Sequence, residues 1–159
     1  MTKVLISCFL IFFTSSYIIA QGDVVIENFE NSWEQDFSKA KALAKKANKP
    51  ILVFFTGSDW CGPCKMLDAD IFKSEEFKKL SDSEFILYEA DFPRNTNLIT
   101  NSQQNDNVFL KEKYGVNSYP TIVIINEKGK EMGRLKGYNL MRDTSYHYSF
   151  FEETLKKIK

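Results

Sequence analysis

The pattern of hydrophobic and polar positions predicts strands that alternate with helices along most of the chain. An unbroken apolar run at Ile51–Phe55 is typical of a central strand that is covered on both faces. Shorter runs predict strands at Val24–Phe29 and Glu84–Asp91. The segment 121–138 predicts a β-hairpin, with its turn at Glu127–Gly129.

Four segments show the spacing of amphipathic helices. The first has its apolar face at Trp33, Phe37, Ala40, Leu43, Ala44 and Ala47, with Ser32 as the expected N-cap and a break at residues 48–50. A second helix should begin at the Cys61–Cys64 segment and run towards Leu80. A short third helix covers 107–115, where Gly115 ends it, and the last covers 145–159.

The element order is therefore β-α-β-α-β-α-β-β-α, which predicts an α/β fold. Alternating strands and helices imply a parallel core sheet, and the late hairpin adds antiparallel strands to it. We expect a central mixed sheet of about five strands flanked by helices, in a single domain covering residues 21–159. The polar segment 92–107, rich in Asn and Gln, is expected to be a loop insertion, either functional or simply tolerated at the surface.

The N-terminal segment has the features of a secretory signal peptide. Lys3 precedes an apolar run from Val4 to Phe13, and a small residue, Ala20, ends the segment before Gln21. We expect cleavage after Ala20, which places the protein in the periplasm or outside the cell. The alternative is an uncleaved membrane anchor, because residues 4–20 approach the length that spans a bilayer.

Charge gives no reason to expect a nucleic-acid partner. Removal of the leader takes Lys3 with it and leaves one basic residue fewer than the 21 acidic ones. A nearly neutral domain lacks the positive surface that nucleic acid or anionic membranes attract. Membrane contact is then expected only through the leader, if it is retained.

The cysteines indicate redox chemistry. Cleavage would remove Cys8 and leave Cys61 and Cys64 in an oxidising compartment. Zinc needs about four ligands, and haem attachment needs a histidine where Lys65 stands, so we expect neither a metal nor a cofactor. A purely structural disulfide is a weaker alternative, because the loop that it would close is very short.

A C-x-x-C sequence at a helix start suits reversible disulfide exchange. Cys61 would lie at the helix N-terminus, where free N–H groups and the helix dipole favour a thiolate. Cys64 would lie one turn further in, less exposed. This makes Cys61 the nucleophile, which forms a mixed disulfide with a substrate, and Cys64 the thiol that resolves it.

The sequence resembles the thioredoxin family over roughly residues 33–159. The resemblance rests on W-C-G-P-C-K at 60–65, Y-P-T at 119–121 and G-Y at 137–138. Within the family the opening F-T-G-S-D-W-C is similar to exported thioredoxin-like proteins. The resemblance implies a cis Tyr119–Pro120 bond beside the cysteines. It also implies a substrate-docking surface formed by Trp60, Gly62, Pro63, Tyr119, Pro120 and Gly137. The alternative role for Trp60 is simple core packing.

The chain departs from the family at the proton-transfer position. Thioredoxins usually carry a buried Asp before the motif and a Lys on the neighbouring strand. Here the acid position falls on Phe55, or on Phe54 with a one-residue shift, and the lysine position on Leu87. Water, or a carboxylate of Asp59 or Glu89, would then deprotonate Cys64, unless resolution is simply slow.

These observations predict a thiol-disulfide oxidoreductase that works as a reductase. Gly62-Pro63 adds no charge or imidazole to stabilise a thiolate, which favours a potential near the roughly −270 mV of thioredoxin, although Lys65 acts modestly in the opposite direction. We expect disulfide-containing exported proteins as clients and a membrane thiol-transfer protein as electron donor. The alternatives are an oxidase or isomerase on the same fold, and a redox-inactive binding or chaperone-like module. A cysteine protease is excluded because the single histidine, His147, falls in the last helix and is expected at the surface or in packing.

Overall fold

Four strands form one mixed sheet in the order β2-β1-β3-β4 in the computed structural model, which describes residues 33–158. The strands are β1 (Ile51–Thr56), β2 (Ile86–Asp91), β3 (Thr121–Ile125) and β4 (Glu131–Lys136). β1 pairs with β2 in parallel and with β3 antiparallel, and β3 pairs with β4 antiparallel. The α/β fold and the mixed sheet are confirmed. The strand predicted at Val24–Phe29 lies outside the described residues.

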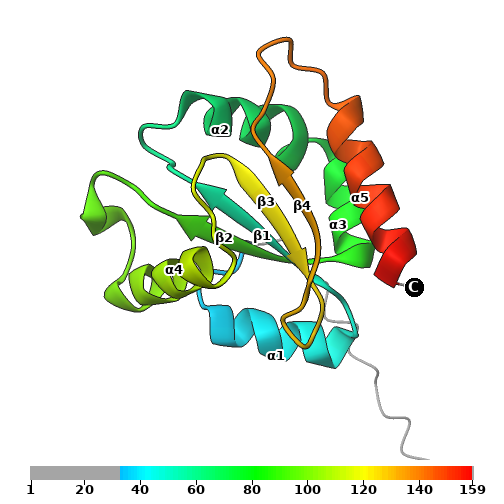
Figure 1. Ribbon diagram of the computed structural model, residues 1–159, viewed down its shortest axis with the longest axis horizontal. Coiled ribbons are helices and arrows are strands. Elements are labelled where there is room, and N and C mark those ends of the chain that lie inside the picture. Colours follow the sequence, from blue (N-terminus) through cyan, green and yellow to red (C-terminus); the bar gives the residue numbers. More distant parts are fainter. Residues whose placement is uncertain (1–32, 159) are drawn as a thin grey trace, which may run out of the picture.

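The helices cover both faces of this sheet (Figure 1). They are α1 (Phe37–Ala47), α2 (Gly62–Leu67), α3 (Glu75–Glu84), α4 (Asn101–Lys113) and α5 (Ser145–Ile158), with a π-helical segment η1 (Asp68–Phe72) and a single 3₁₀ turn η2 (Thr96–Leu98). α1 and α4 lie on one face, and α2, α3 and α5 on the other (Figure 1).

Each face of the sheet carries its own hydrophobic core. Successive side chains of a strand point to opposite faces, so Leu52 and Phe54 enter one core while Val53 and Phe55 enter the other. β1 is buried along its whole length, as an unbroken apolar run predicts. Cys61 and Cys64 belong to the core that contains Phe54.

Two helix boundaries differ from the prediction. α1 begins at Phe37, and its N-cap is Asp36, whose carboxylate accepts the N–H of Lys39, rather than Ser32. The helix that follows the cysteines does not continue to Leu80. It ends after η1, and Ser74 starts α3 by accepting the N–H of Phe77 on its hydroxyl.

The expectation of a loop over 92–107 is wrong for its second half. Thr100 caps α4, which begins at Asn101 and continues to Lys113, so the short helix predicted from residue 107 starts six residues earlier. Asn107 is 1% exposed; it receives a hydrogen bond from the Tyr88 hydroxyl and donates one to the Asp91 carbonyl. This helix therefore packs on β2 partly through polar groups.

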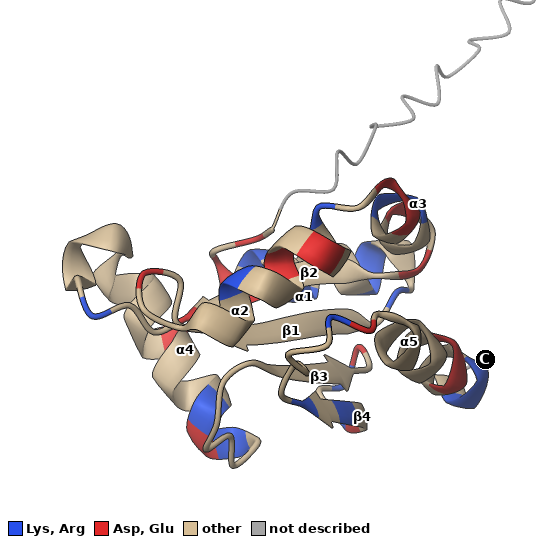
Figure 2. Ribbon diagram, turned by 90° about the horizontal axis from the view of Figure 1, so that it is seen from above, with Lys and Arg blue, Asp and Glu red and all other residues tan. Residues whose placement is uncertain are grey.

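Charged residues lie mainly on the helices and in the loops (Figure 2). β1 and β3 carry none, which fits their burial between the helix layers. Within residues 33–158 no helix is long and apolar enough to cross a membrane. The same residues contain no group of three or more His, Cys, Asp or Glu side chains that could hold a metal ion.

Candidate active site

Cys61 and Cys64 form a disulfide at the start of α2, with their Cα atoms 5.2 Å apart. Cys61 is the N-cap of the helix, and its sulfur accepts the N–H of Cys64 at 3.3 Å. Pro63 occupies the first turn, where a missing N–H costs nothing. Cys61 is 4% exposed and Cys64 1%, so Cys61 is the more accessible residue of the two.

The loop that precedes Cys61 is held by the end of β2. Asp91 accepts hydrogen bonds from the backbone N–H of Ser58 at 2.8 Å and from its hydroxyl at 2.5 Å. The N–H of Phe92 donates to the carbonyl of Thr56. Since β1 and β2 are parallel, their carboxyl ends meet at one edge of the sheet, and these bonds fix the cysteines there.

Asp59, one of the two predicted proton acceptors, organises the next part of this edge. Its carboxylate accepts the N–H groups of Arg94 and Asn95, and these bonds lower its pKa. Its backbone carbonyl accepts a hydrogen bond from the ammonium group of Lys65 at 2.9 Å. Both carboxylate oxygens thus accept hydrogen bonds from the backbone, so Asp59 serves to hold this turn.

Trp60 lies on Gly57 and forms an aromatic cluster beside the disulfide. A Cβ on Gly57 would lie only 2.4 Å from the indole, so the ring and the bare glycine backbone are in contact. The indole N–H donates to the Phe92 carbonyl at 2.9 Å, and the ring meets Tyr119 edge-on at 5.8 Å. The guanidinium group of Arg94 also lies over the Trp60 ring, 5.3 Å from its centroid.

The Tyr119–Pro120 peptide bond is cis. Pro120 is buried, whereas Tyr119 is half-buried and packs between Trp60 and Phe92. The carbonyl of Pro120 accepts the N–H of Gly137 at 2.8 Å, which brings the two predicted docking segments together. Gly62 and Gly137 are exposed, and neither has an atom within 4 Å of the place where a Cβ would be.

Phe54, rather than Phe55, faces the cysteines. Phe54 shares their core, while Phe55 lies in the core on the opposite face. Leu87 also lies on the cysteine side, so the structure has no buried Asp–Lys pair at the two positions expected from the thioredoxin resemblance. Glu89 stands directly opposite Phe54 in the sheet register and therefore projects from the same face as Leu87.

Glu89 is a carboxylate with an unusual proton affinity. Burial, together with the negative charges of Asp91 and Asp68, raises its pKa to about 7, and Lys73 opposes the shift. Asp68 begins η1, and its N–H donates to the carbonyl of Cys64. Glu89 thus faces the helix one turn beyond Cys64.

Residues 37–144 match the family model of the thioredoxin-like domain. The chain belongs to the thioredoxin-like domain family. It is 37% identical over 103 residues to the protein named "Disulfide bond reductase DsbH" of Chlamydia pneumoniae, a match that covers 65% of this chain and 61% of that one. It is 30% identical over 106 residues to "Thioredoxin-related protein DsbJ" of the same organism, covering 67% of this chain and 30% of that one.

Solved structures agree with this family. A structure titled "DsbH Oxidoreductase" has a TM-score of 0.69 and 31% identity, and the match covers 86% of this chain and 92% of that one. A putative disulphide-isomerase from Bacteroides thetaiotaomicron has a TM-score of 0.54 and 28% identity, covering 80% and 89%. The chain spans about three fifths of DsbH and about three tenths of DsbJ among the curated relatives.

Several residues that build this thioredoxin-like site were not predicted from the sequence. Gly57, Ser58, Asp91 and Phe92 hold the cysteine loop and Trp60 through contacts that join β1 to the end of β2. Gly57 and Ser58 lie within the F-T-G-S-D-W-C opening, which signalled their importance without showing their partners. Asp91 and Phe92 carried no such signal.

Proposed function

We propose that the chain is a thiol-disulfide oxidoreductase that reduces the disulfides of exported proteins through Cys61 and Cys64. The observation that carries this proposal is the Cys61–Cys64 disulfide at the first turn of α2, in a fold where Tyr119–Pro120 is cis and joined to Gly137. The similarity to a protein named as a disulfide bond reductase supports the direction of electron flow.

The reaction begins with the reduced protein. The Cys61 thiolate attacks one sulfur of the client disulfide, forms a mixed disulfide and releases the other client sulfur as a thiolate. Cys64 then loses its proton and attacks Cys61, which forms the intramolecular disulfide and releases the second client thiol. Two electrons pass to the client, and a dithiol donor must return two electrons to the pair.

Client binding would use the surface around the cis-proline. Exposed Gly62 leaves space in front of Cys61, and Trp60 and Tyr119 give an aromatic wall. The backbone of Tyr119 would pair with an extended client strand, with Pro63, Pro120 and Gly137 bordering it. This arrangement accepts many sequences because backbone groups contribute much of the contact.

Glu89 would accept the proton of Cys64. A buried thiol resists ionisation, and a base works best when its pKa is near the working pH. Glu89 has that property, and it faces the turn of helix that follows Cys64. Water would complete the path between the two groups. This assignment replaces the missing acid at Phe54 with a carboxylate on the neighbouring strand.

The clients and the electron donor belong to the same proposal. The leader predicted at residues 1–20 lies outside the described residues. Export, with cleavage after Ala20, would place the protein and its clients in the periplasm or outside the cell. A reductase there needs reducing equivalents, for which a membrane thiol-transfer protein is the proposed source.

The equilibrium potential of residues 21–159 in graded thiol/disulfide buffers tests the proposal. Thiol counting and Trp60 fluorescence would report the fraction reduced. We expect a value near the roughly −270 mV of a reductase. A value well above about −180 mV would instead assign an oxidase or isomerase.

Catalytic turnover separates the remaining alternative. The protein should reduce a disulfide-linked peptide in the presence of a dithiol, and a Cys61→Ser variant should not. Two results together would refute the proposal and establish a binding module. The wild type would show no turnover, and a Cys61→Ser, Cys64→Ser double variant would still bind clients.

A further inference from the structure

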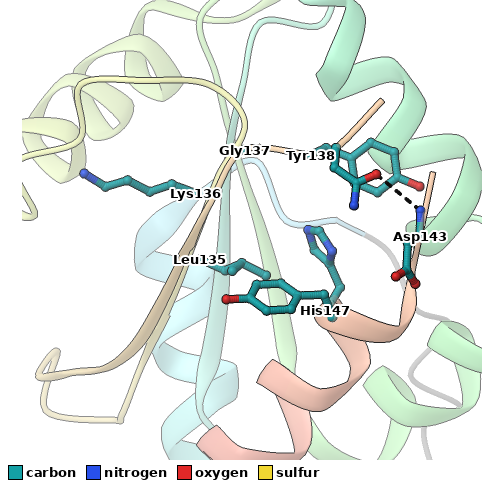
Figure 3. A pocket seen from close by; sticks show the side chains of 8 residues that line it. Leu135, Lys136, Gly137, Tyr138, Asp143 and His147 are labelled. Atoms are coloured by element: carbon teal, nitrogen blue, oxygen red, sulfur yellow. Dashed lines mark hydrogen bonds between the residues drawn. The ribbon is translucent and has the colours of Figure 1, made fainter. Parts of the chain in front are cut away.

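A cavity of about 460 Å³ lies between the end of β4 and the start of α5 (Figure 3). We call it the His147 pocket. Its lining includes Leu135, Gly137, Tyr138, Asp143, Tyr146 and His147. The volume is near the lower end of the roughly 300–1,000 Å³ found for ligand sites, which suits one large side chain.

His147 leaves unmet hydrogen-bonding capacity in this pocket. It is 4% exposed, and neither ring nitrogen has a hydrogen-bond partner within residues 33–158. The imidazole projects from α5 towards Gly137 (Figure 3), whose backbone partly offsets the effect of burial on the pKa of the ring. Buried polar groups are nearly always paired, so this ring lacks a partner that a bound group would supply.

The electrostatic state of His147 limits what that group can be. Burial lowers the pKa of His147, which makes the neutral imidazole the main form near neutral pH. A neutral imidazole offers one donor and one acceptor, and a hydroxyl group complements either of them. Lys136 and Asp143 carry opposite charges at the border of the pocket, so neither an anion nor a cation is favoured as a whole.

The walls of the pocket are fixed by the helix that follows the cysteines. The Tyr138 hydroxyl donates to Asp70 at 2.6 Å, and Arg142 forms an ion pair with the same carboxylate. Asp70 belongs to η1, which continues directly from α2. The Tyr138 ring in turn meets the His147 ring edge-on at 5.4 Å. The imidazole is thus held in place against a wall that is itself anchored.

The pocket continues the proposed docking surface. Gly137 lines it and also donates its N–H to Pro120, so the pocket begins beside the cis-proline. Exposed apolar side chains lie on the adjoining loop and helix start, with Leu140 78%, Met141 89% and Tyr146 67% exposed. An extended client strand that passes Tyr119 and Pro120 would carry a neighbouring side chain to this opening.

We propose that the His147 pocket is a specificity subsite that accepts a tyrosine side chain of the client, with the phenol hydroxyl bonded to His147. The aromatic ring would lie against Leu135, Tyr138 and Tyr146. Phenylalanine would fill the same space and leave the imidazole without a partner. This inference rests on the proposed function, because it assigns a selectivity to the same redox reaction.

The test compares kcat/KM for a series of disulfide-linked peptides that differ at one position. A tyrosine or a phenylalanine is moved from one to four positions on either side of the reacting cysteine. At one position we expect wild type to prefer tyrosine by about threefold to tenfold, the effect of one hydrogen bond, mainly through a lower KM. His147→Phe should remove that preference, so that the tyrosine and phenylalanine peptides react at equal rates.

Two further variants and a small substrate separate a failure of the subsite from a failure of the redox reaction. Tyr146 is exposed, so Tyr146→Ala should fold normally and weaken the reaction of both aromatic peptides. Phe109→Ala, a change of another exposed aromatic side chain on α4, should alter neither. Phe109→Ala should also reduce oxidised glutathione at the wild-type rate. Equal rates for tyrosine and phenylalanine at every position would overturn the subsite and leave the reductase intact. Failure of wild type to reduce even glutathione disulfide would refute the proposed function and the subsite with it.

Discussion

At the scale of single residues, Gly57 determines where Trp60 can lie. The indole occupies the space that a Cβ on Gly57 would need. Such a Cβ would lie 2.4–2.7 Å from three atoms of the Trp60 ring. Gly57→Ala must therefore displace the ring and break its bond to the Phe92 carbonyl. We expect kcat/KM for a disulfide peptide to fall about fivefold to tenfold, the effect of one lost hydrogen bond and its positioning.

Fluorescence would show whether the ring has moved. In a Trp33→Phe background Trp60 is the single fluorophore of its kind, and Gly57→Ala should shift its emission to longer wavelength. Trp60→Phe is the matched control for turnover, because it keeps an aromatic ring while it removes the N–H group together with the larger indole. Unchanged emission and unchanged turnover in Gly57→Ala would show that the contact has no role in docking.

Glu89 predicts a pH dependence of the resolving step. Its pKa of about 7 means that it becomes a base only as the pH rises through neutrality. The rate at which Cys64 resolves a mixed disulfide should increase over that range in wild type. In Glu89→Gln the rate should be about a hundredfold lower at pH 8, the lower end of what a positioned base contributes, and should lose this pH dependence. Stopped-flow measurement of the pre-formed mixed disulfide would record it.

The same residue affects stability with a defined sign. The pKa of Glu89 is raised on folding, so the protonated form stabilises the folded state, and this contribution is lost as the pH rises from about 4.5 to above 7. Glu89→Gln should therefore gain stability relative to wild type between pH 5 and pH 8, by up to about 3 kcal/mol. Urea unfolding at the two pH values measures it. A constant difference would show that Glu89 titrates normally.

At the scale of elements, α4 is attached to the sheet by a buried polar contact. Asn107 joins the Tyr88 hydroxyl and the Asp91 carbonyl, both at 2.7 Å. Asn107→Ala leaves these two groups without that partner, and we expect a loss of about 1–3 kcal/mol in urea unfolding. Asn105→Ala, on the exposed side of the same helix, should change stability by less than about 0.5 kcal/mol. Equal effects of the two changes would contradict this account.

This contact also explains which elements could be predicted from the sequence. β1 and the apolar face of α1 followed from hydrophobic spacing, because apolar residues bury them. The first half of α4 buries Gln103 and Asn107, and Asn has a modest helix propensity, so no periodic apolar signal marked it. The N-cap at Asp36 and the break at Ser74 were missed for another reason, since several polar residues nearby could serve as caps.

The same distinction applies to the site: features carried by local motifs could be predicted, and features that depend on distant contacts could not. Cys61, Cys64 and the cis bond at Pro120 could be expected from short motifs, which are readable within a few residues. The bonds from Asp91 to Ser58 and the contact of Trp60 with Phe92 join residues more than 30 positions apart. Nothing local in the sequence indicates such pairs. The opposition of Glu89 to Phe54 depended on the register of two strands, which periodicity does not fix.

At the scale of the whole molecule, the hydrophobic cores provide most of the stability, whereas the Cys61–Cys64 disulfide provides the redox chemistry. Two hydrophobic cores, one on each face of the sheet, bury the large side chains of β1, β2 and β3 and of the helices around them. The disulfide links residues only three positions apart at the edge of one of these cores. Closing so short a loop restricts the unfolded chain less than a long cross-link would.

Reduction should therefore leave the fold intact. We expect the reduced protein to unfold cooperatively in urea, with a free energy of unfolding within about 3 kcal/mol of the oxidised form, because short-loop disulfides contribute no more than that. Circular dichroism of both forms, with thiols counted before and after, gives the comparison. Cys61→Ser, Cys64→Ser should match the reduced wild type. A protein that unfolds on reduction would make the disulfide a structural bond and would remove the basis for a catalytic cycle, since each turnover would then unfold the molecule.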